Sequence, residues 1–138
     1  MLRRTAMAAP LSLLVALAAC RSQPGADAAA AGRPMPVVFF TDDSAAMGTE
    51  ARAVVAQAAE QARARPRVPV AVRGFTATDQ NAGPAFSRAL AEARAQNVAD
   101  ALVANGVPRD RIRVQPRPAV PFEMMPVESR RVEIHVGG

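Results

Sequence analysis

Arg94 is the residue whose position most needs a chemical explanation. It stands four positions after Leu90 and four before Val98, so a helix would place it on the apolar stripe that faces a core. A charge there needs a partner or an outlet into a cleft. A guanidinium binds a carboxylate through two parallel hydrogen bonds, which an ammonium cannot copy. Arg94 is therefore a candidate binding residue at a cleft. The alternative is a structural arginine that reaches the sheet edge or pairs with an acid such as Asp79.

The other reactive side chains offer little further chemistry. The chain has one Cys, Cys20, and one His, His135, which excludes a disulfide framework and an all-protein structural zinc site within one chain. His135 falls on the polar side of an alternating pattern, so we expect it to be solvent-exposed. Asp42 and Asp43 are adjacent and would point apart on an extended segment, so we interpret them as turn formers. We expect no catalytic activity, no cofactor and no metal.

The composition restricts the class of partner. The 138 residues suit one domain with appendages. All 17 basic residues are Arg, the net charge is +5, and aromatic residues make up 4%, all of them Phe. Modules that stack nucleic-acid bases on aromatic platforms need more aromatic side chains than this. We therefore expect no nucleic-acid partner.

The first twenty residues have the pattern of an export signal. Arg3 and Arg4 precede an apolar stretch that is too short to span a bilayer permanently and ends in small residues. Leu17–Cys20 resembles the lipobox of bacterial lipoproteins, in which the Cys becomes the first residue and is acylated. The alternative is an ordinary signal peptide with an incidental Cys. Because Arg21 is not Asp, the resemblance favours a lipid anchor in the outer membrane, on its periplasmic face.

Three parts of the chain follow from these patterns. We predict a signal peptide at 1–19, a lipidated Cys with a flexible linker at 20–36, and one domain at 37–138. The linker is rich in Ala, Gly and Pro and has no apolar periodicity.

Within the domain, apolar spacing predicts two helices. One begins at Thr49, as the N-cap, and ends near Arg65; the other spans Pro84–Ala104, with Phe86 on its apolar face. Four short apolar or alternating runs predict strands, centred on Val37–Phe40, Val68–Val72, Ile112–Val114 and Val132–Val136. The order β-α-β-α-β-β predicts an α/β two-layer sandwich with both helices on one face of a mixed sheet.

Four stretches in this order resemble the OmpA C-terminal-like domain family, which includes the peptidoglycan-associated lipoprotein. They are Phe40–Ser44, Gly74–Thr76, Leu90–Leu102 and Ser129–Ile134, which resemble the family's FDFDS, GHTD, LSxxRAxxVxxxL and NRRVEI motifs. Together they extend over about 100 residues of the chain, and each motif alone is weak.

The resemblance implies binding to peptidoglycan through the diaminopimelate of its peptide stem. In this family an Asp and an Arg, fifteen residues apart, hold the free amino-acid end of diaminopimelate. Asp79 lies fifteen positions before Arg94, so the resemblance assigns the ligand's ammonium to Asp79 and its carboxylate to Arg94. Thr41 and Asp42 match positions that border the ligand cleft, and Arg130 is a third candidate ligand.

The loop that carries Asp79 departs from the family's pattern. It reads Gly74–Asp79 as GFTATD, whereas the family has GHTD, so two residues are inserted if Asp79 is the matching acid. The expected function is an outer-membrane lipoprotein that binds peptidoglycan non-covalently and tethers membrane to wall, with other envelope proteins as possible partners. The alternative is a degenerate domain without wall binding that acts as a periplasmic protein-interaction or assembly module.

Overall fold

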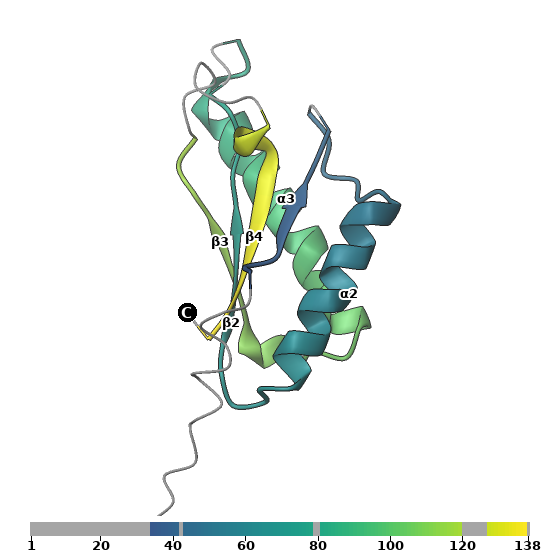
Figure 1. Ribbon diagram of the computed structural model, residues 1–138. Coiled ribbons are helices and arrows are strands. Elements are labelled where there is room, and N and C mark those ends of the chain that lie inside the picture. Colours follow the sequence, from purple (N-terminus) through teal and green to yellow (C-terminus); the bar gives the residue numbers. More distant parts are fainter. Residues whose placement is uncertain (1–33, 42, 79–80, 120–126, 138) are drawn as a thin grey trace, which may run out of the picture. The chain divides into compact units, whose positions relative to one another are not determined.

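Four strands form one mixed sheet with the spatial order β1-β4-β2-β3 (Figure 1). Their bounds are Val37–Phe39 for β1, Val70–Gly74 for β2, Ile112–Pro116 for β3 and Arg131–Val136 for β4. The two inner strands, β4 and β2, are antiparallel, as are β1 and β4, whereas β2 and β3 are parallel. The parallel pair requires a crossover, which the second helix of the domain supplies.

Two helices cover one face of this sheet. Helix α2 spans Thr49–Arg63 and connects β1 to β2; α3 spans Gly83–Ala104 and connects β2 to β3 (Figure 1). Two short 3₁₀ helices, η1 at Arg109–Arg111 and η2 at Glu128–Arg130, precede β3 and β4. The predicted α/β two-layer sandwich, with its β-α-β-α-β-β order, is confirmed.

The computed structural model describes residues 34–41, 43–78, 81–119 and 127–137. The predicted signal peptide, Cys20 and most of the predicted linker lie outside this part of the chain, as do Asp42 and Asp79. None of the helices in the described ranges is both long enough and apolar enough to cross a membrane.

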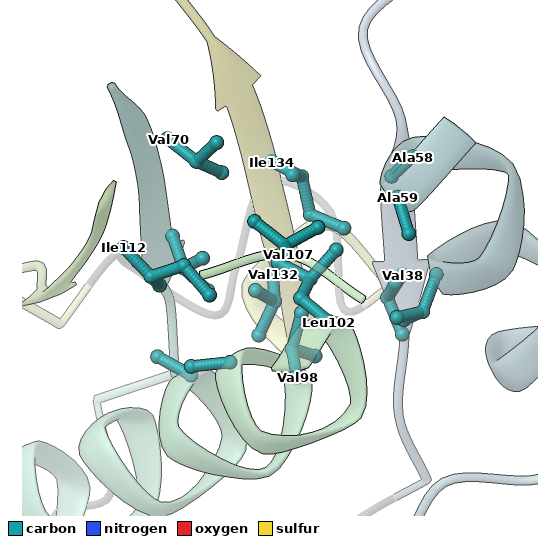
Figure 2. Packing of buried hydrophobic residues seen from close by; sticks show 14 of the residues in the cluster. Val38, Ala58, Ala59, Val70, Val98, Leu102, Val107, Ile112, Val132 and Ile134 are labelled. Carbon is teal, nitrogen blue, oxygen red and sulfur yellow. The ribbon is translucent and has the colours of Figure 1, made fainter. Parts of the chain in front are cut away.

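The core lies between the helices and the sheet and is made mostly of Ala and Val (Figure 2). Alternation places Val70 and Val72 of β2, and Val132 and Ile134 of β4, on the covered face, where all four are fully buried. Leu102 of α3 is the largest of the fully buried apolar side chains.

Small residues bring α3 very close to the end of β2. A Cβ atom at Gly74 would lie 2.1 Å from the backbone oxygen of Ala91 and 3.1 Å from the Cβ of Ala95. Glycine at the last position of β2 therefore allows the middle of α3 to rest directly on the strand. This contact fixes how closely the part of α3 that carries Arg94 approaches the sheet, because Arg94 lies between Ala91 and Ala95 on the same helix.

Local predictions were wrong at three places. Helix α2 has Gly48 as its N-cap, so Thr49 is its first residue, not its cap. Strand β2 begins at Val70, which leaves Pro69 before the strand. Phe86, predicted on the apolar face of the second helix, is 44% exposed, because the first turns of α3 extend beyond the core cluster.

The sheet face opposite the helices carries a charged network on β4. Arg131 donates a hydrogen bond from Nε to Glu133 Oε1 at 2.8 Å, and Glu133 Oε2 lies 3.0 Å from His135 Nε2. Arg73 Nη1 of β2 lies 3.4 Å from the same histidine nitrogen. The predicted solvent exposure of His135 is wrong, because these neighbours bury about three quarters of its side chain.

Candidate functional site

The Arg94 side chain is buried on the core-facing side of α3, as its helical spacing predicts. It is 1% exposed and is the largest fully buried side chain of the described residues. Charged side chains are almost never buried so completely without partners, because the loss of hydration is costly. The arrangement around its guanidinium therefore has to supply strong acceptors.

Three backbone carbonyl groups supply those acceptors. Arg94 donates from Nε to the Ser44 oxygen at 2.8 Å and from Nη2 to the Thr41 oxygen at 3.0 Å. Its Nη1 donates to the Phe75 oxygen at 3.4 Å. The first two carbonyls belong to the β1–α2 loop and the third follows β2, so one side chain ties together two loops that are distant in sequence.

Two N–H groups of the same guanidinium are not used in these three bonds. A guanidinium has five N–H groups, and the three bonds to carbonyls use one on each nitrogen. One N–H on Nη1 and one on Nη2 are therefore not used in them. A carboxylate that is bound in a bidentate manner needs one N–H from each of two such nitrogens.

The electrostatic surroundings keep this site cationic. Burial lowers the pKa of Arg94 from its usual value, and the nearby negative charge of Asp43 acts in the opposite direction. An arginine guanidinium stays charged at neutral pH, so the site presents a positive charge with little water around it. The guanidinium carbon also lies 5.5 Å from the centre of the Phe40 ring, within the range of a cation–π contact.

Asp43 was interpreted from the sequence only as a turn former. It has a positive φ of 48°, which Asp adopts more readily than most residues. Its electrostatic effect on Arg94 could not be seen in the sequence, since the two residues are 51 positions apart.

Further hydrogen bonds hold both loops against α3. The side-chain amide of Asn97 donates to the Ala45 oxygen at 2.8 Å, which fixes the β1–α2 loop. The buried hydroxyl of Thr76 donates to the Ser87 oxygen at 3.0 Å, which fixes the segment after β2. Neither residue was predicted from the sequence to be part of the site. Their only signal was their position within the stretches that resemble family motifs.

Of the predicted site residues other than Arg94, the structure describes Thr41 and Arg130 but not Asp42 and Asp79. Thr41 contacts Arg94 directly, but through its backbone oxygen. Arg130 lies in η2, and its backbone oxygen accepts a hydrogen bond from Phe40 N at 2.8 Å, so its main chain adjoins the end of β1. Asp42 and Asp79 lie outside the described residues, so their roles stay predictions.

A surface groove of about 370 Å³ opens beside Thr41, between the end of β1 and the first turn of α2. Its lining residues are Phe39, Phe40, Thr41, Ala46, Gly48, Thr49, Glu50 and Ala51. Within the described ranges, no group of three or more His, Cys, Asp or Glu side chains is placed to hold a metal ion.

The OmpA family model matches residues 39–120, which is more than half of the chain. Among curated protein sequences, none matches this chain closely enough to show a relationship.

Several solved structures are similar to this fold. The peptidoglycan-associated lipoprotein from Burkholderia pseudomallei has a TM-score of 0.64 and 21% identity, over 73% of this chain and 89% of that one. The C-terminal domain of MotB from Helicobacter pylori has a TM-score of 0.62 and 22% identity, over 78% of this chain and 86% of that one. The OmpA-like domain of FopA1 from Francisella tularensis has a TM-score of 0.63 and 19% identity, over 71% of this chain and 68% of that one.

These comparisons agree with the architecture and with the order of the elements. This chain belongs to the OmpA family, as the four sequence motifs predicted. The family match includes Arg94 and both loops that its guanidinium joins.

Proposed function

We propose that this chain binds peptidoglycan non-covalently through the diaminopimelate of the peptide stem and does no covalent chemistry on it. The observation that carries the proposal is the buried guanidinium of Arg94, whose Nη1 and Nη2 each have an N–H beyond the three carbonyl bonds. The similarity to a peptidoglycan-associated lipoprotein supports the same reading.

The chemistry of the ligand explains the residue types. The free end of diaminopimelate carries an ammonium and a carboxylate on one carbon, so its binding site needs one group of each charge. Arg94 receives the carboxylate in a bidentate manner, and Asp79 receives the ammonium. Thr41, Asp42 and Arg130 border the bound ligand.

The N-terminal part of the proposal concerns the anchor and the location. Cys20 carries the lipid, and two or more acyl chains anchor a protein stably where a single chain does not. The residues after it link the lipid to the domain. The protein is thereby placed on the periplasmic face of the outer membrane, where it tethers the membrane to the wall.

Co-sedimentation of the full chain with purified sacculi tests this function. We expect the wild-type chain to sediment with the sacculi, and Arg94→Gln and Asp79→Asn to weaken binding by about 2–5 kcal/mol each, the usual cost of removing one partner of a desolvated charge pair. Arg67→Gln, on an exposed residue between α2 and β2, is the matched control and should bind like wild type.

Two results would contradict the proposal. If the folded wild-type chain does not sediment with sacculi, the alternative of a degenerate domain with a protein-interaction role is favoured. If it sediments and both site variants bind equally well, peptidoglycan is bound elsewhere on the molecule.

A further inference from the structure

A second groove lies between the start of α3 and the end of β3, the edge strand of the sheet. Its volume is about 380 Å³, and it is lined by Pro84, Arg88, Pro116, Arg117, Pro118 and Ala119. The first two residues belong to the start of α3, and the others include the end of β3 and the segment after it. Of the six lining residues that the structure describes, two are cationic and none is acidic.

Both cationic side chains are available to a ligand. Arg88 and Arg117 are exposed, and within the described part of the chain neither side chain makes a hydrogen bond or an ion pair. The first turn of α3 contains no acidic residue, so the positive end of the helix dipole adds to the charge of the groove. Three prolines give its walls a restricted backbone.

The backbone fixes this groove relative to the Arg94 site. The Arg117 backbone N–H donates to the Gly74 oxygen at 2.9 Å, and the next residue, Phe75, accepts a hydrogen bond from Arg94. Thr76 then bonds to the Ser87 oxygen, one position before Arg88. The two arginine sites therefore flank one short segment, Gly74–Thr76, which is held on both sides.

We propose that the Arg88–Arg117 groove is a second carboxylate subsite that binds the glutamate carboxylate of the same peptide stem. This inference rests on the proposed function. In a wall stem the glutamate is joined through its side-chain carboxyl group to the end of diaminopimelate opposite the free end, and its own α-carboxylate is free. The two carboxylates are therefore separated by the length of both side chains, which lets them occupy two different sites. The two subsites would select a stem peptide over the free amino acid.

Calorimetric titration of the full chain with two ligands tests the inference. The ligands are meso-diaminopimelate and the tripeptide L-Ala–γ-D-Glu–meso-diaminopimelate. We expect the double variant Arg88→Gln/Arg117→Gln to bind the tripeptide about five- to tenfold more weakly, as for two exposed ion pairs. Its affinity for diaminopimelate should equal that of wild type, whereas Arg94→Gln should lose affinity for both ligands.

A chemical change in the ligand completes the test. Amidation of the glutamate carboxylate should weaken tripeptide binding to wild type by the same factor, and should have no effect on the double variant. The control Arg67→Gln/Arg113→Gln removes two exposed arginines near the other end of β2 and β3 and should behave like wild type.

Each contrary outcome is distinct. The inference is overturned if the double variant binds the tripeptide like wild type, if the control loses as much affinity, or if amidation has no effect on wild type. If wild type binds neither ligand, the proposed function fails and the inference fails with it.

Discussion

Two arginines at opposite ends of β2 make similar bonds for different reasons. Arg94 donates to three carbonyls beyond the C-terminal end of the strand, and Arg111 donates to three carbonyls before its N-terminal end. The acceptors of Arg111 are the backbone oxygens of Ala62, Arg65 and Val68, at 2.8–3.0 Å from Nε or Nη2.

The acceptors explain Arg111 completely. The last carbonyl groups of a helix have no partner within the helix, and Ala62 lies in the last turn of α2. Arg111 adds side-chain donors to carbonyls that also accept backbone N–H groups, Arg65 N at the Ala62 oxygen and Val68 N at the Arg65 oxygen, and it is a structural residue. Carbonyl bonds alone are therefore no sign of a ligand site.

Arg94 differs in burial and in its surroundings. Arg94 is 1% exposed, whereas Arg111 is only half-buried. The charge of Arg94 also interacts with that of Asp43. The acceptors of Arg94 lie in two loops, not at the end of a helix. One N–H on each of its terminal nitrogens is not used in the bonds to these carbonyls. The comparison predicts that Arg94 serves both stability and binding, and Arg111 stability alone.

Arg94→Met should have the largest effect on stability. It removes the Arg94 donors from three carbonyls, of which the Thr41 oxygen still accepts a hydrogen bond from Ser44 N. Each buried acceptor left without a donor costs about 1–3 kcal/mol, so we expect the free energy of unfolding in urea to fall by at least about 2 kcal/mol. An unchanged urea midpoint would show that the three bonds contribute nothing to the fold.

We expect the second-largest effect on stability from Gly74→Ala, because the added methyl group would lie 2.1 Å from the Ala91 backbone oxygen. The shift of α3 that relieves this overlap should cost about 1–3 kcal/mol and move Arg94 away from its carbonyls. We therefore expect lower stability together with weaker sacculus binding. Loss of stability with full retention of binding would separate the position of α3 from the site.

Arg111→Met should reduce stability by about 1–3 kcal/mol, at the lower end because water can reach a half-buried site. Sacculus binding by the folded variant should be unchanged. A parallel loss of binding would remove the distinction between the two arginines.

Glu133→Gln should have the smallest effect, and one that depends on pH. Burial raises the pKa of Glu133, but the hydrogen bonds and charges of His135 and Arg131 together lower it by more, so it lies below the usual value of 4.5. A lowered folded-state pKa stabilises the protein above that pH, and the effect is lost as the pH falls through the folded-state pKa. At pH 7 the free energy of unfolding of wild type should exceed that of the variant by up to about 1 kcal/mol.

Thermal unfolding of both proteins between pH 7 and pH 3 measures this difference. The gap between their midpoints should close as the solution becomes acidic. A gap that widens toward pH 3 would mean that the charge of Glu133 does not stabilise the network.

The sequence predicted the fold well because the relevant signals are local. Apolar periodicity located the helices and strands, and Gly106, with a left-handed φ of 90°, follows the C-cap of α3. The spacing of Leu90, Arg94 and Val98 correctly predicted a buried charge. The prediction that Phe86 lies on the buried face was wrong because periodicity cannot show where the core ends beneath a long helix.

The partners of Arg94 could not be predicted from the sequence. They are backbone carbonyls at positions 41, 44 and 75, and a carbonyl has no sequence signature. The role of Arg111 was missed for the same reason. The pairing of Asp79 with Arg94 stays a prediction, since Asp79 lies outside the described residues.

The most direct test follows the arginine side chains by NMR while meso-diaminopimelate is added. The account predicts that the Nε–Hε signal of Arg94 shifts and saturates, because its Nη groups bind the ligand's carboxylate, while the Arg111 signal stays in place as an internal control. An Arg94 signal that does not move while the chain binds sacculi would contradict the central claim.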